Sequence, residues 1–298
     1  MRYGFQNRQT SDLSNSDGSA GIIRLTGRDI RWLKHIERHG PQSSSYLHAL
    51  SKDTHRSKDT ALRQLQKLRN SGHLHLPKQQ RATYRAGFNP FIYALTERGK
   101  DALHDRGMAE PTLQPHGHWV HGFMTACASA SIDMTAQRHN VRFIPGHKIL
   151  EIKQAPLAVP IGGRKLIPDQ LFALDYGGSY RAFAMEVDRG TEPKRSKTPR
   201  KSYVSSIRLY RHLLERGLHR DHYGLKANLL ILWVFSSRAN EERFLDLVAD
   251  HAGGTARAFL TQSVEGFQDD WRPPELWTHL FEDPWNRAGA PPVSIEKG

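Results

Sequence analysis

Three acidic residues in two short segments of the chain have the types and spacing of a metal site. Pro168-Asp169 and Glu186-Val-Asp188 each border an apolar run that is typical of a β-strand. Because side chains alternate along a strand, Glu186 and Asp188 point to the same face, and a hairpin turn at Gly177-Gly178 brings Asp169 alongside them. Carboxylate oxygens grouped in this way are ligands for Mg²⁺ or Mn²⁺. The sequence therefore predicts Asp169, Glu186 and Asp188 as metal ligands and as catalytic candidates.

The charge of the chain indicates what such a site would act on. The 298 residues contain 43 Lys and Arg against 30 Asp and Glu, a formal net charge of +13 at pH 7. That balance favours a polyanionic partner, and nucleic acid fits it better than a membrane surface. A bound Mg²⁺ would lower the pKa of a coordinated water and neutralise charge on a scissile phosphate. Acids and charge together lead to the hypothesis of phosphodiester chemistry on double-stranded DNA.

Other features of the composition exclude several classes of protein. The chain lacks a run of about 18 apolar residues that could cross a bilayer, and residues 1–22 are polar, aperiodic and without the apolar core of a signal peptide. We therefore expect a disordered leader on a cytoplasmic protein with no membrane contact. The single cysteine, Cys127, has no partner in the chain for a disulfide or a cysteine zinc site, and its small neighbours predict a buried structural thiol.

The segment 23–110 has the element order of a winged helix-turn-helix. Thr26 with Asp29 resembles a helix N-cap, and the first helix continues from there to Gly40-Pro41. A short helix, a third helix from Arg56 to Arg69 with a leucine stripe, a basic β-hairpin and a further helix follow. In a winged helix the third helix lies in the major groove of DNA.

The cations of this segment are the predicted DNA contacts. They are placed to face away from the leucine stripe or to stand on the hairpin, where they can meet phosphates. The predicted DNA-binding residues are Arg56, Lys58, Arg63 and Lys67 on the third helix and Lys78, Arg81 and Arg85 on the hairpin. The alternative is that these cations form ordinary solvated faces, and some winged helices contact proteins instead.

Residues 116–265 have the pattern of a second, α/β (α+β) domain. A long helix of small residues starting at His118 is followed by strand candidates, two further helices and a nearly continuous apolar run typical of a central strand. The strand candidates are 141–152, 165–174, 181–187 and 228–235, and the helices after the first are 202–216 and 240–251. The resulting order is αβββαβ. Residues 266–298, rich in Trp and Pro, are interpreted as an extension that wraps this domain.

Three histidines, His116, His118 and His121, stand at the start of the long helix. Their spacing invites a zinc interpretation, but no Cys or acid nearby completes the three or four ligands that such sites need. Hydrogen bonding at the helix end is the simpler interpretation.

The αβββαβ order resembles the PD-(D/E)xK nuclease-like superfamily. Pro168-Asp169 is expected to end the second strand and Glu186-Val-Asp188 the third, as the motif requires. The lysine position of the motif, two residues after the acid, is occupied by Asp188. In this superfamily the lysine sometimes stands on a neighbouring element, and Lys165 and Lys201, together with Lys197, are candidates here. Lys165 has an even spacing to Asp169, and Lys201 precedes a predicted helix.

A closer resemblance covers residues 25–250. The winged helix, the start of the long helix at His118-Trp-Val-His121, the run Glu186-Val-Asp-Arg-Gly-Thr-Glu192 and the tyrosines Tyr203 and Tyr210 are similar to the replication-relaxation family. The resemblance implies DNA binding and a role in replication, relaxation or mobilisation of plasmids and other mobile elements. Members of the family often carry a lysine ahead of the second tyrosine, where this chain has Ser205-Ser206.

Two hypotheses follow from these observations. In the first, the protein is a metal-dependent DNA endonuclease or nicking factor that uses the acids. In the second, it is a non-catalytic regulator in which the acids form salt bridges with Arg189, Arg195 or Lys201. A regulator that reads a palindromic site would act as a homodimer.

Overall fold

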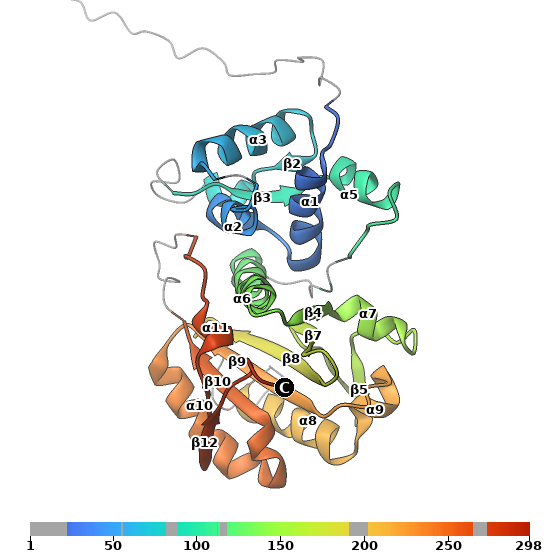
Figure 1. The fold of residues 1–298 in the computed structure, drawn as a ribbon. Coiled ribbons are helices and arrows are strands. Elements are labelled where there is room, and N and C mark those ends of the chain that lie inside the picture. The colour runs from blue at the N-terminus through green and yellow to red at the C-terminus, as the bar shows by residue number, and fades with distance from the viewer. Residues whose placement is uncertain are drawn as a thin grey trace, which may run out of the picture.

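The computed structural model describes residues 23–54, 56–81, 89–111, 113, 118–190, 202–264 and 273–298, with the Arg81 side chain outside the description. The chain is a mixed α/β protein in which an N-terminal unit stands on a larger sheet-containing unit (Figure 1). The predicted leader and the candidate residues Arg85, His116, Lys197 and Lys201 lie outside the described residues. No helix in the described ranges is long and apolar enough to cross a membrane.

The N-terminal unit consists of short helices around a small antiparallel sheet with the order β1-β3-β2. The Thr26 hydroxyl accepts from the backbone N–H of Asp29, whose carboxylate accepts from the backbone of Thr26, so the predicted N-cap is confirmed as a capping box. A core that contains Trp32, Leu65 and Leu68 holds the helices together. Its elements are α1 (Gly27–His39), β1 (Gln42–Ser43), α2 (Ser44–Leu50), α3 (Lys58–Asn70), β2 (Leu74–His75), α4 (Lys78–Arg81), β3 (Ile92–Leu95) and α5 (Glu97–His104).

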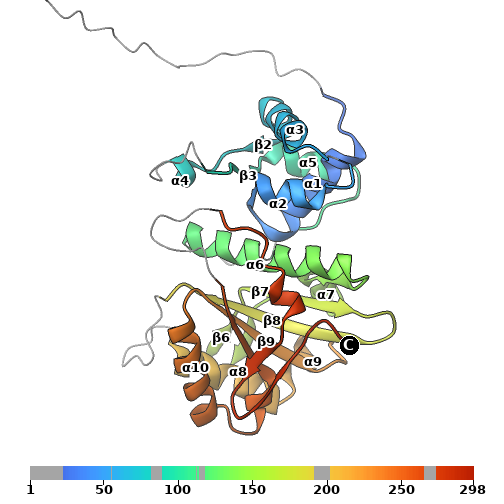
Figure 2. The same cartoon turned by 60° about the vertical axis from the view of Figure 1, so that its left-hand side comes forward.

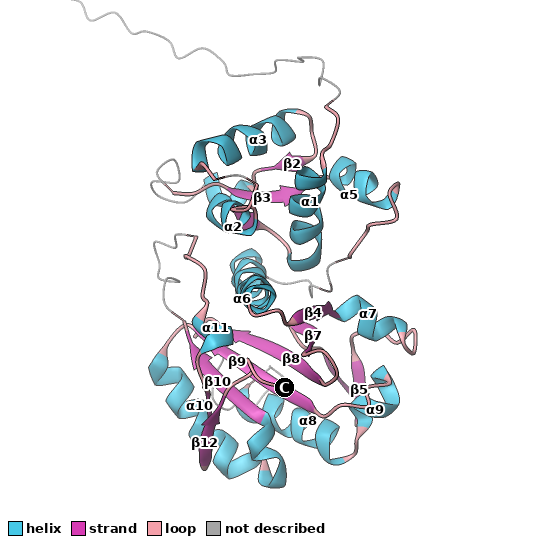
Figure 3. Ribbon diagram, in the orientation of Figure 1, coloured by secondary structure: helices cyan, strands magenta, loops and turns pink. Residues whose placement is uncertain are grey.

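The second unit is built on a seven-stranded sheet with the order β12-β11-β10-β9-β8-β7-β4 (Figure 3). Strands β8, β9 and β10 are parallel, and the other pairs are antiparallel. Its helices are α6 (Trp119–Arg138), α7 (Gly146–Glu151), α8 (Tyr203–Glu215), α9 (Leu218–Tyr223), α10 (Arg238–His251), the 3-10 helix Gly253–Ala258 and α11 (His279–Glu282). Its strands are β4 (Arg142–Pro145), β5 (Val159–Ile161), β6 (Arg164–Leu166), β7 (Gln170–Asp175), β8 (Tyr180–Asp188), β9 (Leu229–Phe235), β10 (Phe259–Ser263), β11 (Trp285–Arg287) and β12 (Ala290–Val293).

Alternate side chains of the sheet pack into two separate hydrophobic cores, one on each face. Phe183, Met185 and Val187 of β8 pack with α6 and α11 on one face, whereas Ala182 and Ala184 pack with α8 and α10 on the other. The acids at 186 and 188 follow the alanines in this alternation. They therefore face the α8 side of the sheet.

Helix α6 is buried on both of its sides. Every residue from Phe123 to Met134 is buried, because the sheet covers one side and the N-terminal unit the other (Figure 2). Tyr46 and Ile92 of the N-terminal unit belong to the same apolar core as α6. Gln42 Nε2 donates to the Ala126 carbonyl at 3.2 Å, and the Tyr46 hydroxyl lies 3.0 Å from Ser131 Oγ. Small residues around the whole circumference of the helix permit this double packing, and Cys127 is the buried thiol that the sequence predicts.

Two strand predictions need correction. The predicted strand 141–152 is the short β4 followed by α7, which begins at Gly146, where a Cβ atom would lie 2.4 Å from the Leu171 carbonyl oxygen. The predicted strand 165–174 is interrupted before Gln170, because Pro168 has no N–H to donate to a ladder. Lys165 consequently belongs to the separate β5–β6 sheet.

The C-terminal residues are part of the second unit. Strands β11 and β12 extend the main sheet beside β10. Trp277 and Trp285 are buried in the core shared with α6, and Trp285 donates from its indole to the Leu280 carbonyl at 2.9 Å. The segment therefore completes the sheet as well as anchoring through its aromatic residues.

Candidate functional site

Asp169 stands immediately before β7, beside the carboxyl end of β8. This is a correction to the prediction that it ends a strand, although the antiparallel pairing of Gln170 with Met185 still brings it next to Glu186. Asp169 Oδ2 accepts from the Val187 N–H at 2.8 Å. Its other oxygen, Oδ1, lies 3.0 Å from Nε2 of His121, which stands in the first turns of α6. The carboxylate is buried between the sheet and α6.

Glu186 and Asp188 face α8, where Tyr203 and Tyr210, two turns apart on the same face of the helix, contact them. The Tyr210 hydroxyl donates to Glu186 Oε1 at 2.5 Å. Asp188 Oδ2 accepts from the Tyr203 hydroxyl at 2.8 Å and from the Gly190 N–H at 2.9 Å. Burial first, and then the charge and hydrogen bond of Glu186, raise the pKa of the Tyr210 hydroxyl well above its ordinary value. Tyr210 is therefore a neutral, buried hydrogen-bond donor, which is not the state of an activated nucleophile.

The three acids do not form a compact set of three metal ligands. Among the described residues, a group of three His, Cys, Asp or Glu side chains with ligand atoms within 4.8 Å of one another is found elsewhere, at His35, His39 and Asp133. Asp188 is engaged in closing the turn after β8. Asp169 and Glu186 stand at adjoining strand ends, since Asp169 Oδ2 accepts from the N–H of Val187, the residue after Glu186. One or two carboxylates together with waters are enough for many Mg²⁺ sites, so these two acids fit such an ion better than all three.

The structure adds residues from α6 to the site and removes Lys165 from it. Lys165 is exposed on β6, and the side chain that contacts Asp169 is His121 instead. His118 accepts at Nδ1 from Arg189 Nη1 at 3.0 Å, which agrees with the expectation of hydrogen bonding at the helix end. The sequence indicated His121 for hydrogen bonding at the helix end, but it did not indicate Asp169 as the partner. The two residues are 48 positions apart, so no local sequence pattern predicts their contact, and only the tertiary fold brings them together.

Most of the cations predicted to bind DNA are exposed on α3 or beside it. Arg56, Lys58, Arg63 and Lys67 are all exposed, and Lys78 is exposed at the start of α4. Arg63 and Lys67 lie one turn apart on the face opposite the buried Leu65 and Leu68. Among the described residues, neither has an acidic partner within 4.0 Å. The side chains of Arg81 and Arg85 lie outside the description.

Comparison with known families gives a match over both units. A family model described as Replication-relaxation matches residues 33–229, from the middle of α1 to the first residue of β9. The chain belongs to the replication-relaxation family. The resemblance inferred from the motifs is thus confirmed, and the matched region contains α3, α6 and all three acids. No curated protein and no solved structure matches the chain.

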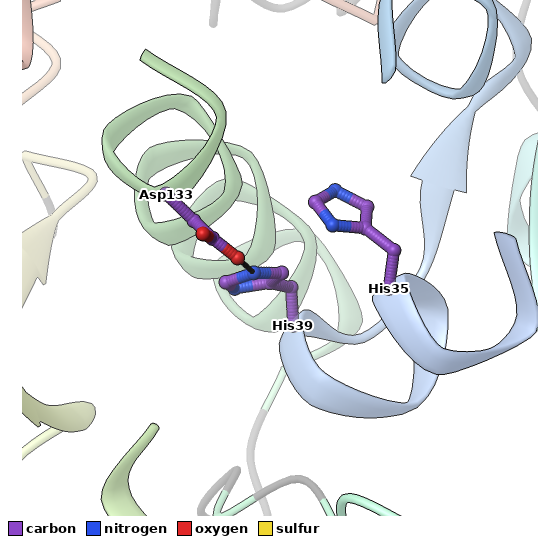
Figure 4. Close-up of side chains that lie close together, drawn as sticks. All are labelled: His35, His39 and Asp133. Carbon is purple, nitrogen blue, oxygen red and sulfur yellow. Dashed lines mark hydrogen bonds and ion pairs between the residues drawn. The ribbon is translucent and has the colours of Figure 1, made fainter. Parts of the chain in front are cut away.

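This replication-relaxation protein also contains a buried polar cluster where its two units meet (Figure 4). Asp133 of α6 accepts from Arg38 Nη1 at 2.7 Å and from Gln137 Nε2 at 2.6 Å, and His39 Nε2 lies 2.8 Å from its Oδ2. His35 stands one turn before His39 on α1. These contacts tie the N-terminal unit to α6.

The protonation states in this cluster follow from burial and from the neighbouring charges. Burial lowers the pKa of His39, and burial followed by the charge of His39 lowers the pKa of His35 well below its ordinary value. For Asp133, burial alone would raise the pKa, but the hydrogen bond of His39 and the charges of His39 and Arg38 outweigh it and hold the pKa below its usual range. The cluster therefore holds an ionised carboxylate, and burial favours the neutral form of both imidazoles.

Proposed function

We propose that this replication-relaxation protein binds double-stranded DNA through its N-terminal unit and acts in replication, relaxation or mobilisation of a mobile genetic element. The order α1, β1, α2, α3, β2, α4, β3 and the sheet order β1-β3-β2 support a winged helix-turn-helix in which α3 enters the major groove. The observation that carries the proposal is the outward face of α3, where Arg63 and Lys67 are exposed without an acidic partner among the described residues.

The charge of the protein supports the same proposal. A net charge of +13 favours phosphate contacts, and an exposed cation that is not neutralised by an acid releases counterions when it meets a phosphate. Gln66 shares the outward face of α3 with Arg63 and Lys67 and is exposed. Arg and Gln are side chains that read base edges in the major groove.

DNA binding can be tested by fluorescence anisotropy with a labelled duplex at several salt concentrations. The double variant Arg63→Ala, Lys67→Ala is expected to bind more weakly and to lower the salt slope by about 1.8, since each phosphate contact contributes about 0.9. Arg238→Ala is the matched control, because Arg238 is exposed on α10 and pairs with Glu242. An affinity that is independent of salt, or a double variant that binds like Arg238→Ala, would contradict the proposal.

Phosphodiester cleavage at Asp169 and Glu186 is the second candidate function. It is supported by the position of the two buried acids at adjoining ends of β7 and β8 in a sheet with the element order of a nuclease-like domain. A Mg²⁺ or Mn²⁺ ion held by them would supply a water of lowered pKa and neutralise phosphate charge. His121 orients Asp169, and the Tyr210 hydroxyl orients Glu186.

The non-catalytic alternative rests on the same contacts. If the hydroxyls of Tyr203 and Tyr210 permanently satisfy the acids, the second unit serves DNA contact or dimerisation. Incubating supercoiled plasmid with the protein and Mg²⁺ or Mn²⁺ separates the two. Cleavage predicts nicked circles that Asp169→Ala and Glu186→Ala abolish and that Glu242→Ala leaves unchanged. Absence of nicking, with DNA binding intact, favours the regulator, and light scattering of the DNA complex then reports whether two copies bind.

A further inference from the structure

Two histidines and an aspartate come together in the interior, away from the acids at the sheet edge. His35 and His39 stand one turn apart on α1, and Asp133 approaches them from α6 (Figure 4). One potential ligand atom of each residue lies within 4.8 Å of the others, and all three side chains are buried. The proposed DNA binding and cleavage do not use these residues.

The hydrogen bonds of the cluster leave ligand capacity unused. His39 Nδ1 lies 2.9 Å from Ser129 Oγ, which directs Nε2 toward Asp133. His35 Nε2 is buried and has no hydrogen-bond partner in the described structure. A buried ring nitrogen without a partner costs free energy, so its place beside a second imidazole and a carboxylate calls for a physical reason.

We propose that His35, His39 and Asp133 bind a Zn²⁺-class transition-metal ion that fastens the N-terminal unit to α6. Two imidazole nitrogens and one carboxylate oxygen are a donor set that zinc accepts with a water in the fourth position. Imidazole ligands favour Zn²⁺, Ni²⁺ or Cu²⁺ over Mg²⁺. This site is independent of any Mg²⁺ at Asp169 and Glu186.

The surroundings can accommodate the ion. Arg38 would give up part of its interaction with Asp133, but its Nε keeps Glu110 Oε2 at 2.5 Å. Gln137 holds the other oxygen of Asp133, and Ser129 holds the far nitrogen of His39, as outer partners commonly do around metal ligands. A metal ion binds imidazole through a ring-nitrogen lone pair, and the buried Nε2 of His35, which has no hydrogen-bond partner in the described structure, offers one.

The test uses the full chain, stripped with a chelator and dialysed against ZnCl₂ or CoCl₂. We expect one metal per chain by plasma mass spectrometry after gel filtration, and the intense visible absorption of tetrahedral Co²⁺. His35→Leu is expected to weaken binding by more than about 100-fold. The fold should survive this change, because Leu fills the apolar space and no partner of His35 Nε2 is lost.

His104→Ala is the matched control, because His104 is exposed at the end of α5 and could hold only adventitious metal. Asp133→Asn, which keeps the shape of the side chain, is expected to weaken Zn²⁺ binding as well. The proposal is overturned if the wild-type chain holds no stoichiometric metal, or if His35→Leu and Asp133→Asn bind Zn²⁺ as tightly as His104→Ala does.

Discussion

Replacing Asp133 with Ala should destabilise the protein far more than the loss of a surface ion pair. The change removes the acceptor of three short contacts, from Arg38, His39 and Gln137, at a side chain with no solvent exposure. Breaking a buried pair typically costs about 3–5 kcal/mol, because the remaining partner stays buried without compensation. Arg38 is 19% exposed and keeps Glu110, so we expect about 3 kcal/mol, at the lower end of that range.

The measurement is urea unfolding followed by circular dichroism, with a chelator present so that metal binding cannot contribute. Glu242→Ala is the matched control, since it removes an exposed pair with Arg238 on α10 whose contribution should be about 0.3–0.5 kcal/mol. A loss below about 1 kcal/mol for Asp133→Ala would refute the view that this carboxylate ties the units together. An unfolding curve that splits into two transitions for the variant alone would strengthen it.

Three further predictions concern the second unit. Tyr210→Phe should lower the free energy of unfolding by about 1.5–3 kcal/mol in urea, because a buried carboxylate loses a donor; the exposed Tyr180→Phe should be neutral, and equal effects would contradict us. Burial raises the pKa of Tyr176 from 10.0 to about 12, so the contribution of this phenol to the free energy of unfolding is complete below pH 10 and is lost as the pH rises through 12. The free energy of unfolding should therefore fall across this pH range. A flat profile would argue against burial of the phenol. Trp285→Ala should cost about 3–5 kcal/mol and expose the C-terminal strands to limited proteolysis, whereas unchanged protease resistance would show that they hold without this anchor.

Local chemistry made part of the fold predictable. The capping box joins Thr26 to Asp29, only three positions away, so the local sequence shows it. The nearly continuous apolar run of β9 likewise indicates a strand that is buried on both faces. The hairpin between β7 and β8 followed from its glycine turn, and it places Asp169 beside Glu186 as expected. Whether these acids act on DNA stays a prediction.

Other features depend on the tertiary environment and left no local signal. Residues 146–151 form α7 although the sequence predicts a strand there, and Gly146 at the start of this helix lies against the Leu171 carbonyl, a long-range contact that no local pattern shows. His39 and Asp133 are 94 positions apart and meet only because α1 docks on α6. The small residues of α6 predict a long buried helix. They do not predict that the N-terminal unit covers its second side, since composition does not say what packs against each side of a helix.

The double burial of α6 has a consequence for how such a protein can be altered. Exchanging the N-terminal unit for an unrelated domain would leave Ala126, Ser131 and Asp133 facing a surface that does not complement them. A chimera joined in the linker before α6 would therefore keep the α6 side of this interface without the side that the N-terminal unit provides. The family match, over residues 33–229, includes parts of both units. Under the proposed DNA-binding function, target specificity is therefore expected to change by substitutions on α3 rather than by exchange of the whole N-terminal unit.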